Sequence, residues 1–228
     1  MHKRTLALAA VAMVGIASSV PAQAGIIAEP TRAQLGGNYT VNWNQFGADG
    51  AGLSTPVFEP VGPESVSVAS SSGALQVRRQ GSDWNGNFAP DDYLLFQPNL
   101  SDSFIVAFST PVSAVGTQIQ NDIYGAFTGI MDFYNSSNVL LGEVTVSGDS
   151  TAAADNSAVF IGGQSTSADI SYVTFLTDDN NPTFPVHGDL AINQLDFQLD
   201  ATTVPEPGSM ALFAVGLGGL GLLRRRRA

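Results

Sequence analysis

The stretch AINQLDFQL, residues 191–199, decides the fold class. In its second half Leu195, Phe197 and Leu199 alternate with polar residues, which is a period of two. Successive side chains of a β-strand point to opposite faces of the sheet. We therefore expect these three side chains to be buried and the residues between them to face water, as in an amphipathic strand.

Segments of the same kind recur upstream. Short runs rich in Val, Ile, Phe, Thr and Tyr are separated by clusters of turn-forming residues, and they begin near residues 74, 92, 103, 113, 127, 138, 157 and 169. The run SFIVAF at 103–108 is almost wholly apolar, which favours a central strand covered on both faces but leaves a short buried helix open. Together the runs predict an all-β fold: a single jelly-roll-like antiparallel β-sandwich over residues 25–199.

Two further segments complete this body. Residues 25–38 are expected to form a loose lead-in, and the serine-rich stretch around residue 70 a hairpin loop. Residues 200–204 form a polar linker that proline stiffens on its C-terminal side.

The N-terminus is typical of a secretory signal peptide. Lys3 and Arg4 precede an apolar run at 6–16, and small residues follow up to Ala22 and Ala24. We expect residues 1–24 to be removed by cleavage before Gly25. An uncleaved anchor is the alternative, although the run is short for a hydrocarbon core of about 30 Å.

The charge of the body limits its partners. Between residues 25 and 203, three arginines stand against 19 acidic residues, which gives a formal net charge of −16. Binding to nucleic acid needs a basic surface, so this class of partner is excluded. Anionic membranes and polyanionic sugars would be repelled unless divalent cations intervene. The chain has no cysteine, and a domain of this size can bury enough apolar surface without disulfides.

The C-terminal segment, residues 205–228, reads PEPGSMALFAVGLGGLGLLRRRRA. As a helix, its apolar, glycine-rich run at 210–223 would rise about 21 Å, against about 30 Å of hydrocarbon. The segment therefore predicts a short hydrophobic helix that anchors the chain only transiently in the inner membrane. The positive charges would stay on the cytoplasmic side. They are Arg224, Arg225, Arg226 and Arg227.

This segment resembles the PEP-CTERM sorting domain of Gram-negative exopolysaccharide-producing bacteria. The resemblance lies in the order of its parts: Pro205, Glu206 and Pro207 come first, then the apolar run, then the arginines. The resemblance implies that an exosortase-type membrane protease recognises the Pro-Glu-Pro and cuts the chain at or near it. It also implies a final place in the cell envelope or the exopolysaccharide matrix. An ordinary tail anchor is the alternative.

Parts of the body resemble, less specifically, the secreted domains that carry such tails. The segments are GSDWNGNFAPDDYLLF at 81–96, PVSAVGTQIQNDIYGAFTGIMDFY at 111–134, SAVFIGG at 157–163 and AINQLDF at 191–197. The resemblance implies a sandwich similar to lectins or carbohydrate-binding modules, and it supplies no activity.

Residues for catalysis are scarce. His187 is the one histidine beyond the signal peptide, and the chain has neither a cysteine nor a G-x-S-x-G motif. Glycosidases need two carboxylates about 5–9 Å apart, and the glutamates of the body are scattered. We therefore expect a non-enzymatic envelope or matrix protein. A glycan-binding module and a glycan-cleaving enzyme are the alternatives.

One polar segment, residues 83–92, suggests a calcium loop. Oxygen ligands at alternate positions resemble the start of such a loop. Phe88 and Leu94 stand where an EF-hand has its turn glycine and its bidentate glutamate, so a loop rich in Asx turns is the other interpretation. The candidate calcium ligands are Asp83, Asn85, Asn87, Asp91 and Asp92.

Aromatic residues near this segment suggest a sugar platform. An exposed aromatic ring can stack on the apolar face of a sugar. The candidate stacking residues are Trp84, Tyr93 and Tyr124. This hypothesis requires that the rings be exposed, and its partner would be an extracellular polysaccharide.

Overall fold

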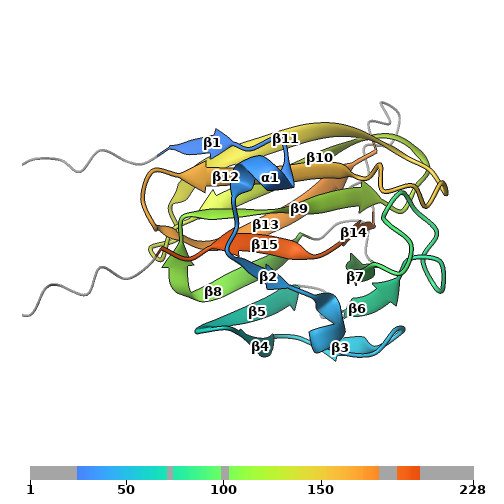
Figure 1. Ribbon diagram of the computed structural model, residues 1–228, viewed down its shortest axis with the longest axis horizontal. Coiled ribbons are helices and arrows are strands. Elements are labelled where there is room, and N and C mark those ends of the chain that lie inside the picture. Colours follow the sequence, from blue (N-terminus) through green and yellow to red (C-terminus); the bar gives the residue numbers. More distant parts are fainter. Residues whose placement is uncertain (1–24, 71–73, 99–102, 180–188, 201–228) are drawn as a thin grey trace, which may run out of the picture.

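Two antiparallel β-sheets pack face to face in the computed structural model of the chain (Figure 1). The structure describes residues 25–70, 74–98, 103–179 and 189–200. The predicted all-β antiparallel sandwich is thus confirmed. Within these residues no helix is long and apolar enough to cross a membrane.

The larger sheet has nine strands. Seven of them follow one another in the order β1 (Ile26–Ala28), β12 (Val159–Ser165), β9 (Ala114–Asn121), β14 (Leu190–Ile192), β7 (Tyr93–Gln97), β6 (Ala74–Arg79) and β3 (Gly52–Ser54). The other two are β15 (Leu195–Gln198), which pairs with β9, and β2 (Tyr39–Val41), which pairs with β15.

The smaller sheet has six strands. Their order is β11 (Leu140–Ser150), β10 (Gly125–Tyr134), β13 (Ile170–Asp178), β8 (Phe104–Val112), β5 (Glu64–Ser70) and β4 (Val57–Val61). Of its two edge strands, β4 contains Pro60, which has no backbone N–H to offer to a further strand. The other edge strand, β11, is eleven residues long, contains no proline and pairs only with β10 among the described strands.

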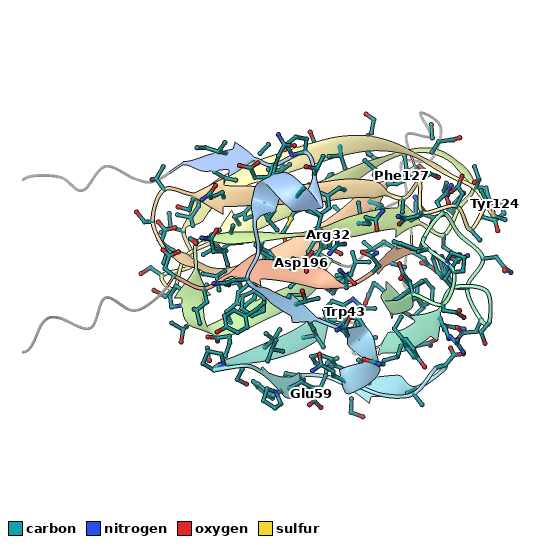
Figure 2. All side chains as sticks on the ribbon, in the orientation of Figure 1. Arg32, Trp43, Glu59, Tyr124, Phe127 and Asp196 are labelled. Atoms are coloured by element: carbon teal, nitrogen blue, oxygen red, sulfur yellow. The ribbon has the colours of Figure 1, made fainter. Side chains whose placement is uncertain are left out.

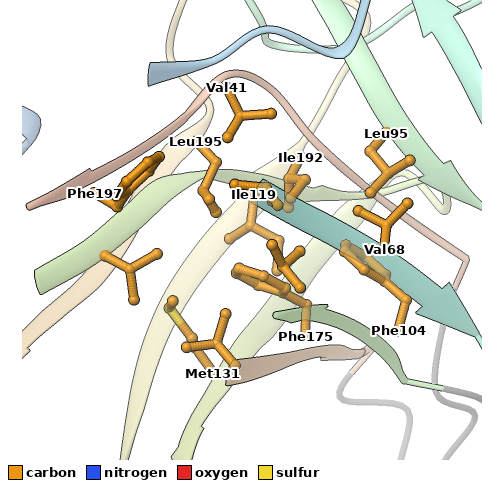
Figure 3. Close-up of a cluster of buried hydrophobic side chains, with 14 of the residues drawn as sticks. Val41, Val68, Leu95, Phe104, Ile119, Met131, Phe175, Ile192, Leu195 and Phe197 are labelled. Atoms are coloured by element: carbon orange, nitrogen blue, oxygen red, sulfur yellow. The ribbon is translucent and has the colours of Figure 1, made fainter. Parts of the chain in front are cut away.

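The core lies between the inner faces of the sheets (Figure 3). Ile119 and Leu195 come from the larger sheet, and Val68 and Phe175 from the smaller one; all four are fully buried. Each inner face is supplied by alternate residues of its strands, because side chains alternate across a sheet. Burial of these apolar side chains is the main stabilising contribution to the sandwich.

The stretch 191–199 forms two strands, β14 and β15, rather than one. Leu195 and Phe197 are fully buried, as predicted. The expectation that the residues between these two face water is wrong for Asp196, which is only 6 % exposed. The Arg32 guanidinium and the Thr40 hydroxyl both donate to its carboxylate (Figure 2). The short helix that contains Arg32 covers the outer face of β15, so the polar residue there is buried with a partner.

The lead-in at 25–38 is more ordered than predicted. It contains β1 and the helix α1 (Arg32–Leu35), and Leu35 is buried. The Thr31 side chain caps this helix by accepting from the backbone N–H of Gln34 at 3.2 Å, and Gly36 ends it at a φ of 65°. A 3₁₀ turn, η1 (Trp43–Gln45), follows β2.

Two other expectations need correction. The serine-rich stretch is not a hairpin, because β5 and β6 belong to different sheets. The run at 103–108 opens β8, which is a central strand and not a helix. Its outer face is not covered, since Ile105 is 36 % exposed. Strand position in the sheet was therefore predictable here, but coverage of its second face was not.

Candidate functional site

The residues of the candidate calcium loop lie between β6 and β7, and their side chains turn to separate partners. Asp83 accepts hydrogen bonds from the Arg79 backbone N–H at 2.7 Å and from Arg78 Nη1 at 3.1 Å. Asp91 pairs with Arg79 Nη2 at 2.6 Å. Two of the five candidate ligands are thus bound to arginines, whose positive charge disfavours a cation in the same place.

The other three candidate ligands also diverge. The Asn85 side chain is exposed, Asn87 is buried, and Asp92 accepts from Nδ2 of Asn193 at 3.0 Å. Within the part of the chain that the structure describes, no group of three or more His, Cys, Asp or Glu could hold a metal ion. The geometry favours the hydrogen-bonded loop over the calcium loop.

The three candidate stacking residues differ in exposure. Trp84 is only 4 % exposed, with the Phe96 ring centroid 5.1 Å from its own, so it offers no free ring face to a sugar. This corrects the stacking hypothesis for Trp84. Tyr93 is half-buried beside the Arg79 guanidinium, 5.8 Å from the ring centroid. Tyr124 is 57 % exposed at one end of the sandwich, and its hydroxyl donates to the carbonyl oxygen of Asn85 at 2.9 Å (Figure 2).

A groove of about 600 Å³ lies beside this loop. It is formed by the end of β11, the loop at 151–158 that follows it, and the start of β12, so it lies between an edge strand of the smaller sheet and a strand of the larger sheet. Its lining residues are Asn87, Ser147, Gly148, Asp149, Thr151, Asp155, Ser157 and Val159. We define these residues as the β11 groove.

Asn87 is the buried residue of the β11 groove, and its side chain is fully hydrogen-bonded. Nδ2 donates to Thr151 Oγ1 and to Ser157 Oγ, both at 2.8 Å. Oδ1 accepts from the Thr151 backbone N–H at 2.6 Å and from Gln120 Nε2 at 3.0 Å. A satisfied buried network of this kind fixes the positions of its members. Asn87 therefore holds the groove in shape rather than offering ligand contacts.

The loop at 151–158 is fixed to the neighbouring loop by its backbone. The Ala154 N–H donates to the Gly86 carbonyl at 2.8 Å, and the Ala158 N–H donates to the Asn87 carbonyl at 3.2 Å. Ala154 and Asn156 adopt positive φ values of 51° and 63°. Alanine adopts this conformation only where its surroundings hold it there, whereas asparagine tolerates it more readily. The loop is thus held in one conformation by contacts with the segment around residue 87.

The polar groups that the groove offers to a ligand come from both the strand and the loop. Ser147 and Asp149 are exposed on β11, and Asp155 is exposed on the loop. The hydroxyl of Ser157 donates to Asp155 Oδ1 at 2.5 Å. This hydrogen bond is the main reason why the pKa of Asp155 is lowered, so the group is an ionised acceptor at neutral pH.

Positive charge is absent from the groove lining. The described part of the chain contains three arginines, and each is engaged in an ion pair elsewhere. The pairs are Arg32–Asp196, Arg78–Asp83 and Arg79–Asp91. The formal charges of the groove are therefore those of Asp149 and Asp155 alone.

The groove lies at the end of the sandwich opposite to the first and last described residues. β1 begins and β15 ends at one end, whereas Tyr124 and the loops around the groove lie at the other (Figures 1 and 2). Along β12, Val159 lines the groove and Ser165 pairs with Ile26 of β1. At about 3.3 Å per residue these two positions are about 20 Å apart.

The groove was not predicted from the sequence, although one of its residues, Asn87, was named for another role. Its other members lie at 147–159, at least 60 residues away in the chain. One signal was available: Gln120, which is 1 % exposed, lies on β9 with two other buried polar residues, Thr117 and Asn121. A buried amide must find polar partners, so it marks a polar network.

The predicted processing residues lie outside the described part of the chain. They are Ala22, Ala24, Pro205, Glu206, Pro207, Arg224, Arg225, Arg226 and Arg227. The short hydrophobic helix and His187 also lie outside it. Gly25, the expected first residue of the mature protein, is described and exposed.

Comparison with known proteins defines the class of this chain. Residues 203–227 match the PEP-CTERM protein-sorting motif. No curated protein matches the sequence. The chain is thus an antiparallel β-sandwich with a PEP-CTERM tail, and the motif marks it as an exported protein that is sorted through its C-terminus.

Three solved structures are similar in fold. CsCBM6-3 from Clostridium stercorarium, in complex with cellobiose, shares 10 % identity at a TM-score of 0.33, over 66 % of this chain and 94 % of that one. A DUF4465 family protein from Bacteroides caccae shares 11 % identity at 0.42, over 70 % and 99 %. TmCBM61 in complex with β-1,4-galactotriose shares 14 % identity at 0.32, over 65 % and 94 %. The ligands named are those of the other proteins.

Proposed function

We propose that the chain is a non-enzymatic envelope or exopolysaccharide-matrix protein whose tail is recognised and cut by an exosortase-type membrane protease. The observation that carries this proposal is the PEP-CTERM motif at 203–227, which begins a few residues after β15, the last strand of the sandwich. The motif thus begins after the last described strand, and a cut within it removes none of the described strands of the sandwich.

The charges of the chain support this route. The signal peptide directs the chain into the export pathway, and the apolar segment then stops in the inner membrane. The four terminal arginines remain on the cytoplasmic side, while the body with its formal charge of −16 stays outside. Cleavage at the Pro-Glu-Pro leaves the sandwich free for the envelope or the matrix.

The β11 groove supports a binding role rather than catalysis. A glycosidase needs a general acid whose pKa is raised, so that it is still protonated near neutral pH. The pKa of Asp155 is instead lowered by its hydrogen bond to Ser157. An ionised carboxylate on a rigid loop suits the acceptance of hydrogen bonds from a ligand. A glycan-binding module is therefore the second candidate function.

The processing step is tested by the intact mass of the protein released from cells with and without the processing protease. We expect the wild-type product to begin at Gly25 and to lack Arg224, Arg225, Arg226 and Arg227. Without the protease, the arginine block should stay on a membrane-bound chain. Replacement of Pro205 and Pro207 by alanine should have the same effect as loss of the protease. An arginine block on released protein from wild-type cells would contradict the proposal.

A further inference from the structure

The β11 groove is built before any ligand arrives. Backbone hydrogen bonds tie the loop at 151–158 to Gly86 and Asn87, and the Asn87 side chain joins it to Gln120 on β9. A rigid site loses little conformational entropy when a ligand binds. Because the network is buried or backbone-anchored, the groove keeps its shape, and the Asp155 carboxylate is held in it by the Ser157 hydroxyl.

The chemistry of the lining selects the class of ligand. Ser147, Thr151 and Ser157 supply hydroxyls, and Asp149 and Asp155 supply carboxylates, so acceptors outnumber donors. A ligand that fits must donate several hydrogen bonds, as a polyol does. An anionic ligand would be repelled by two carboxylates that no cation offsets. An apolar ligand would remove water from these carboxylates, which costs a large amount of free energy.

The shape of the groove indicates how much of a ligand it holds. Its volume of about 600 Å³ is within the range of small-molecule sites, and it is open to solvent rather than enclosed. A polymer can therefore enter the groove from solvent and place a short segment of its chain there. Val159 and the Cα of Gly148 give the lining an apolar part for the C–H faces of these rings.

We infer that the β11 groove binds a segment of an uncharged polysaccharide, with Asp149 on the strand and Asp155 on the loop accepting hydrogen bonds from sugar hydroxyls. The inference rests on the proposed extracellular location, which brings the body into contact with such polymers. Hydrogen bonds to a charged acceptor are stronger than those between neutral groups, so these two carboxylates dominate the polar contacts. Asn87 acts as a positioning residue.

Binding is tested on the full chain in mild detergent, so the result does not depend on whether the tail is cut in cells. Isothermal calorimetry is run against cellotriose, galactotriose, maltotriose and mannotriose as neutral probes, and against trigalacturonate as an anionic probe. Each titration is repeated with EDTA. We expect at least one neutral probe to bind with and without EDTA, and trigalacturonate not to bind.

Asp149→Ala is the most direct variant, because this exposed side chain has no hydrogen bond to any described residue and its loss should not disturb the fold. We expect it to weaken binding at least tenfold, and Asp155→Asn to weaken it as well. Glu143→Ala is the matched control: the residue is exposed on the same strand, six positions from Asp149 and outside the groove. Its affinity should equal that of the wild type.

Four results would overturn the inference. They are no binding to any neutral probe, binding that EDTA abolishes, an equal loss of affinity in the Glu143 control, and preferential binding of trigalacturonate. The second result would make the groove a cation site. If the tail is processed correctly but no probe binds, the sorting proposal stands and the binding inference fails. If a neutral probe binds but the tail is not processed, the binding inference stands and the sorting proposal fails.

Discussion

Asn87 connects segments that lie far apart in the chain: its own loop, β9 and the loop after β11. Alanine at this position leaves the part-buried Thr151 N–H without its acceptor and removes one of the acceptors of the buried Gln120 amide, which keeps Ser150 Oγ at 2.7 Å. We expect Asn87→Ala to lower the free energy of unfolding by about 2–4 kcal/mol. Urea denaturation measures this loss.

The neighbouring Asn85 provides the control for that measurement. It is the same residue type in the same loop, but its side chain is exposed. Asn85→Ala should change the free energy of unfolding by no more than about 0.5 kcal/mol. Equal losses in the two variants would contradict the role assigned to the network around Asn87.

Asp189 makes the free energy of unfolding of the sandwich depend on pH. One of its carboxyl oxygens is enclosed without a hydrogen-bond partner among the described residues. Burial raises the pKa of this group above its ordinary value, and the negative charge of the neighbouring Asp122 adds to the effect. Between the unfolded and the raised folded pKa the native state holds more protons, so the free energy of unfolding falls as pH rises through this window.

The variant Asp189→Asn should therefore be more stable than the wild type at pH 7. The gain should be less than about 1 kcal/mol, because the group is only half-buried. It should shrink as pH falls through the raised folded pKa and disappear below the unfolded pKa, where the wild-type carboxyl is protonated in both states. Thermal melts at several pH values measure this, and a gain that is independent of pH would refute the assignment.

The sequence identified buried residues better than it identified their partners. Leu195 and Phe197 could be predicted because alternation is a local property of the strand. Burial of Asp196 could not, since it depends on Arg32, 164 residues away in the chain. Trp84 was named as a candidate stacking residue on the condition that its ring be exposed, whereas the ring is buried and packs against Phe96.

Among the elements, β11 forms one wall of the groove and depends on a glycine to do so. A Cβ at Gly148 would lie 2.4 Å from the Phe127 ring and 3.1 Å from Val159. Phe127 is only 2 % exposed, so it has no free space into which to move. We expect Gly148→Ala to lower the free energy of unfolding by about 1–3 kcal/mol, measured by urea denaturation.

Gly52 on β3 is the matched control, because a Cβ built there meets nothing within 4 Å. Gly52→Ala should leave the free energy of unfolding unchanged or raise it by less than about 1 kcal/mol, since alanine restricts the unfolded chain. A loss at Gly52 as large as that at Gly148 would mean that crowding is not the cause.

Most strands from residue 74 onward could be predicted, because runs of β-branched and aromatic residues between turn signals are a local pattern. The strands with which each of them pairs could not be predicted. The separation of β5 and β6 into different sheets and the break between β14 and β15 both arise from long-range packing. The first part of the body, with β1 and α1, was underestimated because its elements are short and their order comes from contacts with β12 and β15.

At the scale of the whole molecule, two features oppose each other: the long edge of β11, with which no second described strand pairs, and the negative charge of the body. An unpaired edge can add a strand from another molecule, whereas like charge keeps molecules apart. The Debye length falls from about 10 Å at 0.1 M salt to about 3 Å at 1 M. We therefore expect sodium chloride to promote association, as measured by sedimentation velocity.

Thr145 is exposed in the middle of β11, so Thr145→Glu should shift this association to higher salt. Ser54→Glu adds the same charge to an exposed position of β3, an edge strand of only three residues. It should have a smaller effect. Equal shifts in the two variants would show that total charge, and not the β11 edge, controls association.

The sorting tail and the groove differed in how far they could be predicted. The tail is a linear motif, so its residues are read directly from neighbouring positions. The groove joins residue 87 to residues 147–159 across two sheets, and only the folded chain brings them together.

The position of the groove at the far end from residues 25 and 200 has a thermodynamic consequence. Two events influence each other only through a coupling free energy, and here the ends of the described chain, residues 25 and 200, lie at the other end of the sandwich from the groove. Release from the membrane should therefore leave the affinity of the groove for its ligand unchanged. Bound ligand should likewise leave the affinity of the protease for the tail unchanged. The protein can hold its polymer first and be released afterwards, or the reverse, and it arrives at the same final state.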